Sequence, residues 1–329
     1  MTILITGVGG FVGPHVVRAL RARGDAVWGA GLEPAPPAVL AGDAAVERWV
    51  QWDVAVGHEP AQSLLETGTG VSAVIHLAGQ ASAARSFDDP VGTFAANAGG
   101  TQHLLEAARH ARFKGPVLVV SSSEVYGHVP PGVPIDELAP LAPVSPYGAS
   151  KAAAEALALA YANGYGLRVV IARPFSHTGP GQSPAFAIAS WARQIAGFEA
   201  AHARGEQGPF RLAVGNLDPV RDYSDVRDVA QAYLALIDRG EPGTAYNVAS
   251  GRGVRLADVV AMLAGMARVP VDVIADPARR RPADLTYLVG NAARLAALGV
   301  SPKVRLEVTL SDLLEDARHA AGVPVPGGS

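Results

Sequence analysis

Hydrophobic residues in the first half of the chain alternate between short apolar runs and longer stretches with helical spacing. The apolar runs predict strands over Thr2 to Thr6, Ala26 to Ala30, Val46 to Trp52, Ala73 to Leu77, Val117 to Ser121 and Arg168 to Ala172. The helical spacing predicts helices over Phe11 to Arg23, Val91 to Arg112 and Tyr147 to Tyr165. Apolar strands separated by helices are typical of a parallel sheet covered on both faces. We therefore expect an α/β fold with a doubly wound parallel sheet.

The pattern changes after Arg173-Pro174. A Gly/Pro-rich loop over residues 178–184 precedes a helix expected from Ala185 to Ala203, and shorter helices and strands follow. These include helices over Asp225 to Arg239 and Val254 to Ala267. We predict a first domain over residues 1–173, with a later return around 213–249. Residues 174–212 and 250–329 are expected to form a smaller α/β C-terminal lobe that binds the substrate.

Composition excludes several classes of protein. Hydrophobic residues make up 49% of the 329 positions, so a sizeable core can form. The net charge of −3 gives no reason to expect a nucleic acid or an anionic membrane as partner. The absence of cysteine excludes disulfides and thiolate metal sites, and the nine histidines show no metal-ligand spacing, so no metal is expected. Without a leader pattern or an apolar run of about 20 residues, a cytoplasmic protein is expected.

A glycine-rich segment, Gly7-Val8-Gly9-Gly10-Phe11-Val12-Gly13, directly follows the first strand and opens the first helix. Glycines allow the backbone to turn tightly and approach a pyrophosphate, whose charge is stabilised at the helix N-terminus. The strand–turn–helix context favours dinucleotide binding over a purely structural turn. Gly7, Gly10, Phe11 and Val12 are therefore predicted to bind the cofactor.

The ends of the next strands suggest which dinucleotide binds. Glu33 follows the second strand, a residue or two late for a ribose contact, and no lysine or arginine lies near it. An NAD or NADP cofactor is expected, and the acidic side chain favours NAD. Asp53 follows the third strand and is either an adenine contact or an ordinary loop acid. Leu77-Ala78-Gly79 ends the fourth strand, where small residues let a cofactor pass close to the backbone; His76, beside them, is expected to be a core histidine.

Tyr147 and Lys151 stand four residues apart at the start of a predicted helix, for which Ser145 is the expected N-cap. The spacing puts both side chains on one face, where an ammonium group is expected to lower the pKa of the phenol. Such a tyrosine can exchange a proton with a carbonyl or alcohol. Ser122, at the end of the fifth strand, can hydrogen-bond the same oxygen. In isolation the tyrosine–lysine spacing also occurs by chance on many helices.

Together these motifs resemble the extended short-chain dehydrogenase/reductase family. The resemblance rests on Thr6-Gly7-x-x-Gly10-x-x-Gly13, His76-Leu77-Ala78-Gly79, Ser122 before Val125-Tyr126-Gly127, Tyr147-x-x-x-Lys151 and Arg173-Pro174. It implies a Rossmann-like domain, with Tyr147 as acid/base, Lys151 as the residue that binds the nicotinamide ribose and lowers the tyrosine pKa, and Ser122 as the group that polarises the substrate oxygen. It also implies a nucleotide-sugar substrate in the C-terminal lobe and a homodimer formed through a four-helix bundle.

The second half is similar to the members that reduce GDP-4-keto-6-deoxy-D-mannose and to their kin, the GDP-mannose 4,6-dehydratases. This likeness implies a GDP-sugar substrate bound by Ser176, Gln182, Arg221, Arg281 and Asp284. Guanidinium groups suit phosphate oxygens, and Asp284 suits a ribose. Ser176 and Asp284 are shorter than the usual asparagine and glutamate, which puts their contacts to the sugar diphosphate and to the ribose in doubt.

Glu124 bears on the choice between reductase and dehydratase. In the dehydratases the glutamate of a Thr-x-Glu pattern acts near C5 of the sugar, and Ser122-Ser123-Glu124 keeps that glutamate. The reductases resemble this pattern too, and the downstream motifs favour a reductase. We expect reduction of the C4 ketone to give GDP-D-rhamnose, with Glu124 as a further catalytic candidate. A dehydratase or epimerase of nucleotide sugars, or a non-catalytic nucleotide-binding regulator, are the alternatives.

Overall fold

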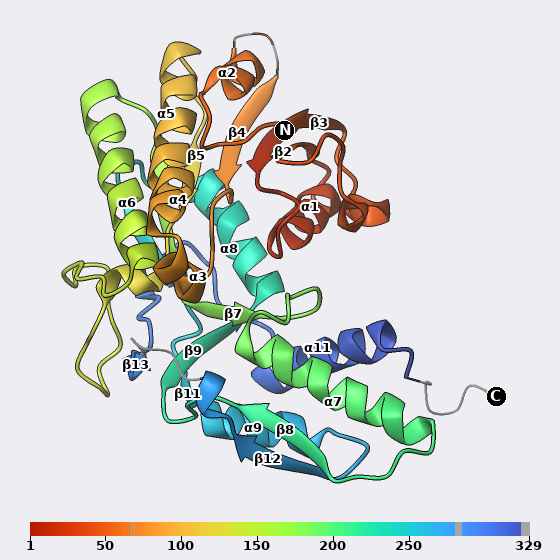
Figure 1. Ribbon diagram of the computed structural model, residues 1–329. Helices are drawn as coiled ribbons and strands as arrows, with labels where there is room; N and C mark the ends of the chain where they lie inside the picture. The colour runs from red at the N-terminus through yellow and green to blue at the C-terminus, as the bar shows by residue number, and fades with distance from the viewer. Residues whose placement is uncertain (67, 69, 280–284, 324–329) are drawn as a thin grey trace.

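Seven strands form the main sheet, in the order β10-β6-β5-β4-β1-β2-β3 (Figure 1). The computed structural model describes residues 1–323 except 67, 69 and 280–284. The strands of this sheet are β1 (Thr2–Thr6), β2 (Ala26–Gly31), β3 (Arg48–Gln51), β4 (Val71–His76), β5 (Val117–Val120), β6 (Val169–Pro174) and β10 (Ala245–Val248). Every neighbouring pair runs parallel. The doubly wound parallel sheet predicted from the sequence is therefore confirmed.

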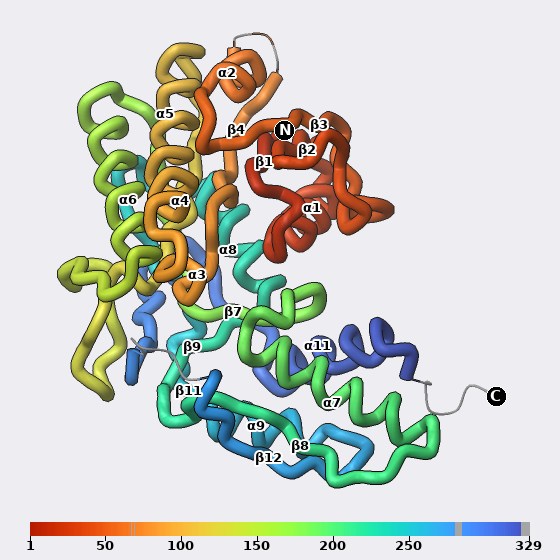
Figure 2. The backbone as a smooth tube through the Cα atoms, in the orientation of Figure 1, coloured from red at the N-terminus to blue at the C-terminus, as the bar shows by residue number. Residues whose placement is uncertain are grey.

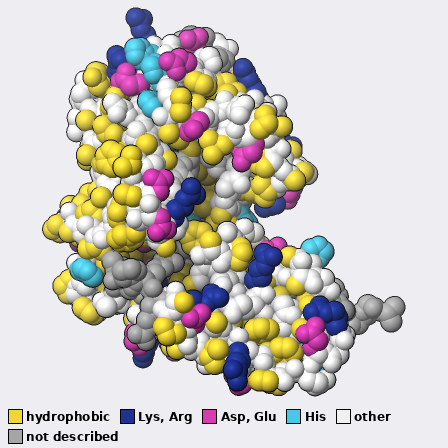
Figure 3. Space-filling view, in the orientation of Figure 1, with side chains coloured by type: hydrophobic (Ala, Val, Ile, Leu, Met, Phe, Trp, Pro, Cys, Tyr) yellow, Lys and Arg dark blue, Asp and Glu magenta, His cyan; other side chains and the backbone are white. Residues whose placement is uncertain are grey.

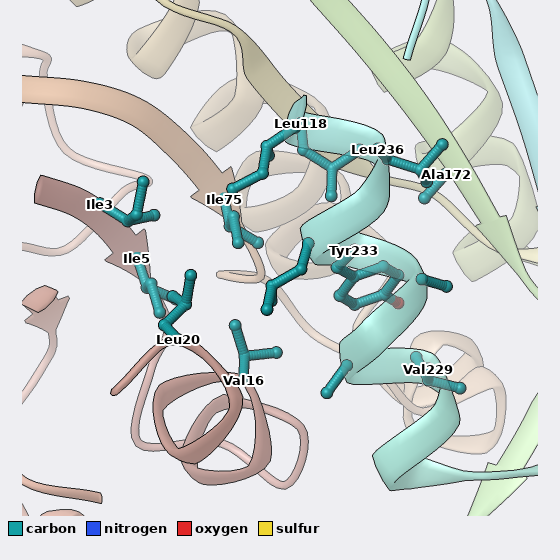
Figure 4. Packing of buried hydrophobic residues seen from close by; sticks show 14 of the residues in the cluster. Ile3, Ile5, Val16, Leu20, Ile75, Leu118, Ala172, Val229, Tyr233 and Leu236 are labelled. Atoms are coloured by element: carbon teal, nitrogen blue, oxygen red, sulfur yellow. The ribbon is translucent and has the colours of Figure 1, made fainter. Parts of the chain in front are cut away.

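Helices cover both faces of this sheet. One face packs against α1 (Gly13–Ala22), α8 (Val226–Arg239) and α10 (Ala293–Ala297), and the other against α2 (Glu59–Leu65), α5 (Gly100–His110) and α6 (Pro146–Tyr165). Figure 4 shows the first of these cores, where Leu20 of α1 and Tyr233 of α8 lie among side chains of β1 and β4. Along β1, Ile3 and Ile5 enter this core while Leu4 enters the opposite one. The continuous apolar run follows from this burial on both sides.

The segment predicted as one helix over residues 91–112 is helical from residue 90 to residue 110 and contains a π-helical turn. The structure has α3 (Ala83–Asp88), α4 (Pro90–Phe94), a π-helical turn η3 (Ala95–Gly99) and then α5. The predicted helix is therefore confirmed, with a change to π-helical hydrogen bonding at this turn. Asn97, buried at its centre, donates its side-chain amide to Ser150 Oγ at 2.9 Å and accepts from the Gln80 backbone at 2.8 Å. These contacts hold the turn out of regular helical geometry, and Gly99 and Gly100 weaken the local preference for it.

The C-terminal lobe lies beyond the carboxyl ends of the strands. Its elements are β7 (Ser176–Thr178), α7 (Ala187–Ala203), β8 (Phe210–Val214), β9 (Val220–Asp225), β11 (Gly253–Arg255), α9 (Leu256–Gly265), β12 (Val271–Ala275), β13 (Tyr287–Leu288) and α11 (Leu306–Ala320). Strand β9 pairs with β7, β11 and β13, and β8 pairs with β12. Helices α7, α9 and α11 close the core of the lobe. Short helical turns are η1 (Ala38–Leu40), η2 (Gly42–Ala44), η4 (Ser123–Tyr126) and η5 (Pro277–Arg279).

The chain passes between the sheet and the lobe more than once (Figure 2). It leaves after β6, builds β7 to β9 in the lobe, and returns as α8 and β10, which pairs with β6 from Ala245↔Ile171 to Val248↔Pro174. The return begins at Val226 rather than near residue 213, because β9 pairs with strands of the lobe. Among the described helices, none combines the length and the apolar character needed to cross a membrane.

Candidate active site

The glycine-rich turn between β1 and α1 admits hardly any side chains. Gly7 has φ +66°, and a Cβ there would lie 2.5 Å from Ala78 Cα; a Cβ on Gly13 would lie 1.8 Å from the Val8 carbonyl oxygen. Helix α1 begins after Val12 without a side-chain cap. The positive end of the helix dipole therefore faces this turn without a neutralising side chain, as an anion site requires. Gly7, Gly10, Phe11 and Val12 lie together at this point, on the same side of the sheet edge as the end of β4.

The end of β4 forms the neighbouring wall. Leu77 and Ala78 are half-buried, and Gly79 is exposed with φ +145°, where a Cβ would lie 2.3 Å from Asn97 Oδ1. His76 is buried, with Nδ1 2.7 Å from Thr6 Oγ1, while its Nε2 finds no hydrogen-bond partner among the described residues. Burial lowers the pKa of His76 to about 3. Neither the glycine turn after β1 nor the segment after β4 has room for larger side chains. The backbone at both places can therefore come close to a bound dinucleotide.

Glu33 and Asp53 lie at the same edge, after β2 and β3 respectively. Both side chains are exposed. The Glu33 carbonyl accepts a hydrogen bond from Trp49 Nε1 at 2.9 Å, which fixes the backbone beyond β2. Asp53 Oδ1 accepts the Ala55 backbone N–H at 2.9 Å and so closes a turn. Glu33 thus presents its carboxylate to solvent at the place expected for the ribose, whereas Asp53 already has a structural contact.

Tyr147 and Lys151 project from the first turns of α6 into the protein. Ser145 caps the helix by accepting the Gly148 N–H at 3.0 Å, and Pro146 occupies its first turn, so the predicted N-cap is confirmed. Tyr147 is 8% exposed and Lys151 9% exposed. Lys151 Nζ donates a hydrogen bond to the Val120 carbonyl at 2.9 Å. The lysine is therefore anchored to the end of β5, the strand that leads to Ser122.

The pKa of Tyr147 differs from the expectation. Burial raises it to about 12; a hydrogen bond with Ser122 opposes this rise and the charge of Glu124 adds to it. The expected net lowering of this pKa was wrong, because desolvation outweighs the hydrogen bond with Ser122. Burial also lowers the pKa of Lys151 to about 8, against the charge of Glu155. Tyr147 is consequently a phenol at neutral pH, in the form that donates a proton.

Ser122 and Glu124 stand beside this pair. Ser122 is buried and accepts the Glu124 N–H at 3.2 Å. Glu124 Oε2 accepts a hydrogen bond from Ser145 Oγ at 3.2 Å, so the carboxylate lies at the start of α6. Ser122 is thus hydrogen-bonded to Tyr147, and Lys151 lies one helical turn farther along α6. This arrangement can add a proton to, or remove one from, an oxygen on a carbon that gains or loses a hydride.

Asn97 was not recognised from the sequence. It joins the loop after β4 to α6 through its bonds to Gln80 and Ser150, and Ser150 directly precedes Lys151. An asparagine among small residues, Ala95-Ala96-Asn97-Ala98-Gly99, is the sequence feature that could have drawn attention to it, although this feature does not indicate its partners. Asn97 thereby links the loop after β4 to the helix that carries Tyr147 and Lys151.

The segment after β6 carries two of the predicted substrate residues. Ser176 is half-buried on β7. Both polar atoms of the Gln182 side chain serve the loop itself, since Oε1 accepts from Thr178 Oγ1 at 2.6 Å and Nε2 donates to the His177 carbonyl at 3.0 Å. Arg221 lies on β9, half-buried, with Nη1 donating to the Val220 carbonyl at 3.1 Å. Arg281 and Asp284 lie outside the described residues.

An aromatic contact connects this segment with the cofactor turn. The rings of Phe11 and His177 are parallel within 4°, with centroids 6.0 Å apart, and His15 lies edge-on to Phe11. His15 Nε2 also lies 3.0 Å from the Pro180 carbonyl. The molecule is hollowed here between α1 and the helices α7 and α11 (Figure 3). The cofactor turn is therefore in contact with the segment that follows β6, which carries Ser176 and Gln182. No group of His, Asp or Glu in the described ranges could hold a metal ion.

Comparisons with known proteins agree with this geometry. The model of the NAD dependent epimerase/dehydratase family matches residues 3–249. GDP-6-deoxy-D-mannose reductase of Pseudomonas aeruginosa is 38% identical over 320 residues, which cover 95% of this chain and 96% of that protein. The structure of RMD from Pseudomonas aeruginosa with NADPH superposes with a TM-score of 0.80 at 36% identity, covering 97% of this chain and 99% of that one.

An epimerase is similar in fold as well. The Thermus thermophilus UDP-glucose 4-epimerase with NAD gives a TM-score of 0.84 at 31% identity and covers 97% of this chain and 100% of that one. The glycine turn, the small residues after β4 and the Tyr147–Lys151 pair all lie within the matched residues 3–249. This chain is therefore an NAD(P)-dependent enzyme of the NAD-dependent epimerase/dehydratase family, a branch of the extended short-chain dehydrogenases/reductases.

Proposed function

We propose that this enzyme reduces the C4 ketone of GDP-4-keto-6-deoxy-D-mannose to give GDP-D-rhamnose. The observation that carries the proposal is the likeness to GDP-6-deoxy-D-mannose reductase across 95% of the chain, which includes the C-terminal lobe. That lobe holds the predicted sugar-nucleotide residues, whereas the dinucleotide domain is common to the whole family. We place the reaction in the cytoplasm, where reduced nicotinamide cofactors are regenerated.

The side chains around Tyr147 suit a reduction. When bound, the reduced nicotinamide supplies a hydride to C4. Tyr147 transfers its phenolic proton to the C4 oxygen, so that the ketone becomes a secondary alcohol. The raised pKa of about 12 keeps that proton available at neutral pH. Ser122 donates a hydrogen bond to the same oxygen as negative charge develops, and the Lys151 cation stabilises the phenolate that remains.

The dinucleotide would be held by the backbone of the turn formed by Gly7, Gly10, Phe11 and Val12, with Leu77 to Gly79 beneath it. Glu33 is assigned to the adenosine ribose. We assign the sugar diphosphate to the region of Ser176 and Arg221, together with Arg281 and Asp284. Gln182 shapes this region indirectly, because both its polar atoms stabilise the loop after β7.

The test is direct turnover of the proposed substrate. Purified enzyme is incubated with GDP-4-keto-6-deoxy-D-mannose and either NADH or NADPH, and loss of nicotinamide absorbance is followed. We expect oxidation of the cofactor with formation of one GDP-6-deoxyhexose, identified as the rhamnose epimer by proton NMR. If neither cofactor is oxidised, the proposal is wrong.

A dehydratase is the second candidate, and Glu124 favours it. Its carboxylate lies at the start of α6 and acts on Tyr147 through its charge, where it could remove a proton from C5 after oxidation at C4. Incubation with GDP-mannose and oxidised cofactor separates the two reactions. Formation of the 4-keto-6-deoxy sugar, lost in Glu124→Gln, would identify a dehydratase.

We also propose a homodimer formed through α4 and α6, with α3 at its edge. These helices pack together and expose Phe87 (46%), Val91 (79%), Phe94 (51%) and Leu159 (36%). Hydrophobic side chains gather among polar ones on this side of the molecule in Figure 3, and exposed hydrophobic patches mark association surfaces. Light scattering should give the mass of two chains, and Phe94→Glu should shift it toward one.

A further inference from the structure

A buried ion pair lies directly behind the catalytic residues of α6. Glu155 follows Lys151 by four residues and Tyr147 by eight, so the three side chains share one face of the helix. Glu155 is 1% exposed and Arg173 is 6% exposed. Arg173 donates to both carboxylate oxygens, with Nε 3.0 Å from Oε1 and Nη2 2.7 Å from Oε2. The negative charge next to Lys151 is therefore fixed by a bidentate contact.

The same carboxylate also contacts the strand that leads to Ser122. Ser121 Oγ donates a hydrogen bond to Glu155 Oε1, and Lys151 Nζ donates to the carbonyl of Val120, the residue before Ser121. Lys151 and Glu155 of α6 thus hold Val120, the last residue of β5, and Ser121, which follows it. Ser122 follows immediately, so its position depends on these two contacts.

Arg173 is held in turn by groups from other elements. Its Nη1 donates to Tyr126 Oη at 2.9 Å and to the Glu137 carbonyl at 3.1 Å, while Tyr126 Oη donates to Asn247 Oδ1 at 2.7 Å. These bonds come from η4, from the loop before α6 and from β10. The guanidinium cannot move without breaking them, and neither can the carboxylate that it binds.

We propose that Glu155, held by Arg173, is a positioning residue of the active site, whose carboxylate keeps Lys151 charged and orders the end of β5 that carries Ser122. The inference rests on the proposed function, in which Lys151 acts as a cation beside Tyr147. Burial by itself would push the lysine toward its neutral form, and the charge of Glu155 opposes that. An opposite charge within one helical turn changes a pKa by about one unit or more in a buried site.

The other groups near Lys151 do not replace this anion. His76, on β4, is neutral because burial lowers its pKa to about 3. Tyr147, on the same helix, is protonated at neutral pH, and Tyr233 of α8 faces Tyr147 with its own pKa raised by burial. Glu124, from η4, acts on the phenol, and Asn97, from η3, is uncharged. Arg173 is the cation behind Glu155.

A second buried pair in the C-terminal lobe supplies a matched control. Glu199 is 4% exposed and Arg318 7% exposed, and Arg318 donates from Nε and Nη2 at 2.7 Å each. The two pairs have the same chemistry and similar burial, but only Glu155 lies beside the active site. A purely structural role predicts the same effects of substitution at Glu155 and at Glu199.

The experiment measures the ionisation of Lys151 itself. The chain has three lysines, Lys114, Lys151 and Lys303, so selective isotope labelling of lysine gives three side-chain NMR signals. Lys114 and Lys303 are exposed, and replacing each by arginine assigns the remaining signal to Lys151. Its chemical shift is followed against pH in the wild type, Glu155→Gln, Arg173→Gln and Glu199→Gln, with circular dichroism as a check of folding.

We expect opposite shifts from the two halves of the pair. Glu155→Gln should move the Lys151 titration to lower pH by about one unit or more, Arg173→Gln should move it to higher pH, and Glu199→Gln should leave it unchanged. Titration at the wild-type pH in a folded Glu155→Gln variant would overturn the proposal. If neither variant at the pair folds, Glu155→Asp replaces them, because it keeps the negative charge but holds it farther from Lys151. The Lys151 titration should then move to lower pH, by less than in Glu155→Gln. An unchanged Lys151 titration in Glu155→Asp would overturn the proposal.

The pH profile of turnover gives a second readout. The alkaline limb of kcat/KM should follow the Lys151 titration, so that a shift of about one unit makes Glu155→Gln lose about fivefold relative to the wild type at a pH one unit above its new midpoint. The NMR titration needs no substrate. The lysine titration can therefore be interpreted even if the proposed reaction is not observed. Likewise, the turnover assay can be interpreted even if Glu155→Gln does not shift the pKa of Lys151.

Discussion

Replacing Lys151 by methionine is expected to stabilise the protein at pH 7 while removing most of its activity. Lys151 is 9% exposed, and burial lowers the pKa of its ammonium group from 10.5 to about 8. Methionine keeps an unbranched apolar side chain and carries no charge. The substitution thus removes the free-energy cost of holding a cation inside the protein.

The size of the effect follows from the two pKa values. A difference of about 2.5 pH units corresponds to about 3 kcal/mol in the free energy of unfolding. The Val120 carbonyl, which accepts the hydrogen bond from Nζ at 2.9 Å, loses its partner at a cost of about 1 kcal/mol. The variant should therefore be about 2 kcal/mol more stable than the wild type at pH 7.

The difference between the two proteins should also depend on pH. Lys151 binds its proton less tightly in the folded state, so between pH 8 and 10.5 the unfolded chain holds more protons than the folded one. The free energy of unfolding of the wild type therefore increases with pH across this window, and Lys151→Met lacks this increase. The advantage of the variant should shrink as the pH rises from about 8 toward 10.5.

Urea denaturation, followed by the fluorescence of the four tryptophans, measures both quantities. Lys114→Met, at an exposed lysine, is the control and should show neither the gain nor the pH dependence. A Lys151→Met protein that is less stable than the wild type at pH 7, or whose advantage stays constant up to pH 10.5, would refute the reasoning.

Three further predictions concern neighbouring residues. Tyr147→Phe removes the proton donor and should lower kcat by about 10²- to 10⁴-fold with little change in cofactor affinity; near-normal turnover in steady-state assays would exclude Tyr147 as the acid. Ser145→Ala removes the N-cap of α6 and should cost about 1 kcal/mol in urea denaturation, whereas no loss would mean that Pro146 alone starts the helix. The Glu33 carboxylate should repel a 2′-phosphate, so kcat/KM should be higher with NADH than with NADPH and the ratio should fall in Glu33→Gln; a preference for NADPH in the wild type would contradict this assignment.

The strands of the main sheet could be predicted because both their faces are buried. An apolar run such as Thr2–Thr6 has no polar side to confuse its assignment, and the glycine turn after it has one compatible geometry. The cap at Ser145 was predictable for the same reason, since it depends on four consecutive residues. Features that depend on contacts between residues close together in the sequence could therefore be predicted.

Contacts between distant segments decided the rest. The π-helical turn at Asn97 depends on bonds to Gln80 and Ser150, which no local pattern indicates. The pKa of Tyr147 depends on how completely the fold buries it, and the spacing to Lys151 carried no information on that burial. Glu155 could have been singled out by its spacing from Lys151 on α6, but its partner Arg173 lies on strand β6, outside that helix.

Strand β10 follows β6 in the sheet only after the chain has built β7 to β9 of the lobe, over residues 175–225, and has returned along α8. A chain cut after residue 173 would leave β6 as an open edge and would lose α8, which supplies Tyr233 and Leu236 to the core shown in Figure 4. The two parts cannot be exchanged between relatives as terminal modules. New sugar specificities in this architecture have to arise by substitution within the inserted segments, under the constraint that the last strand still finds its place in the sheet.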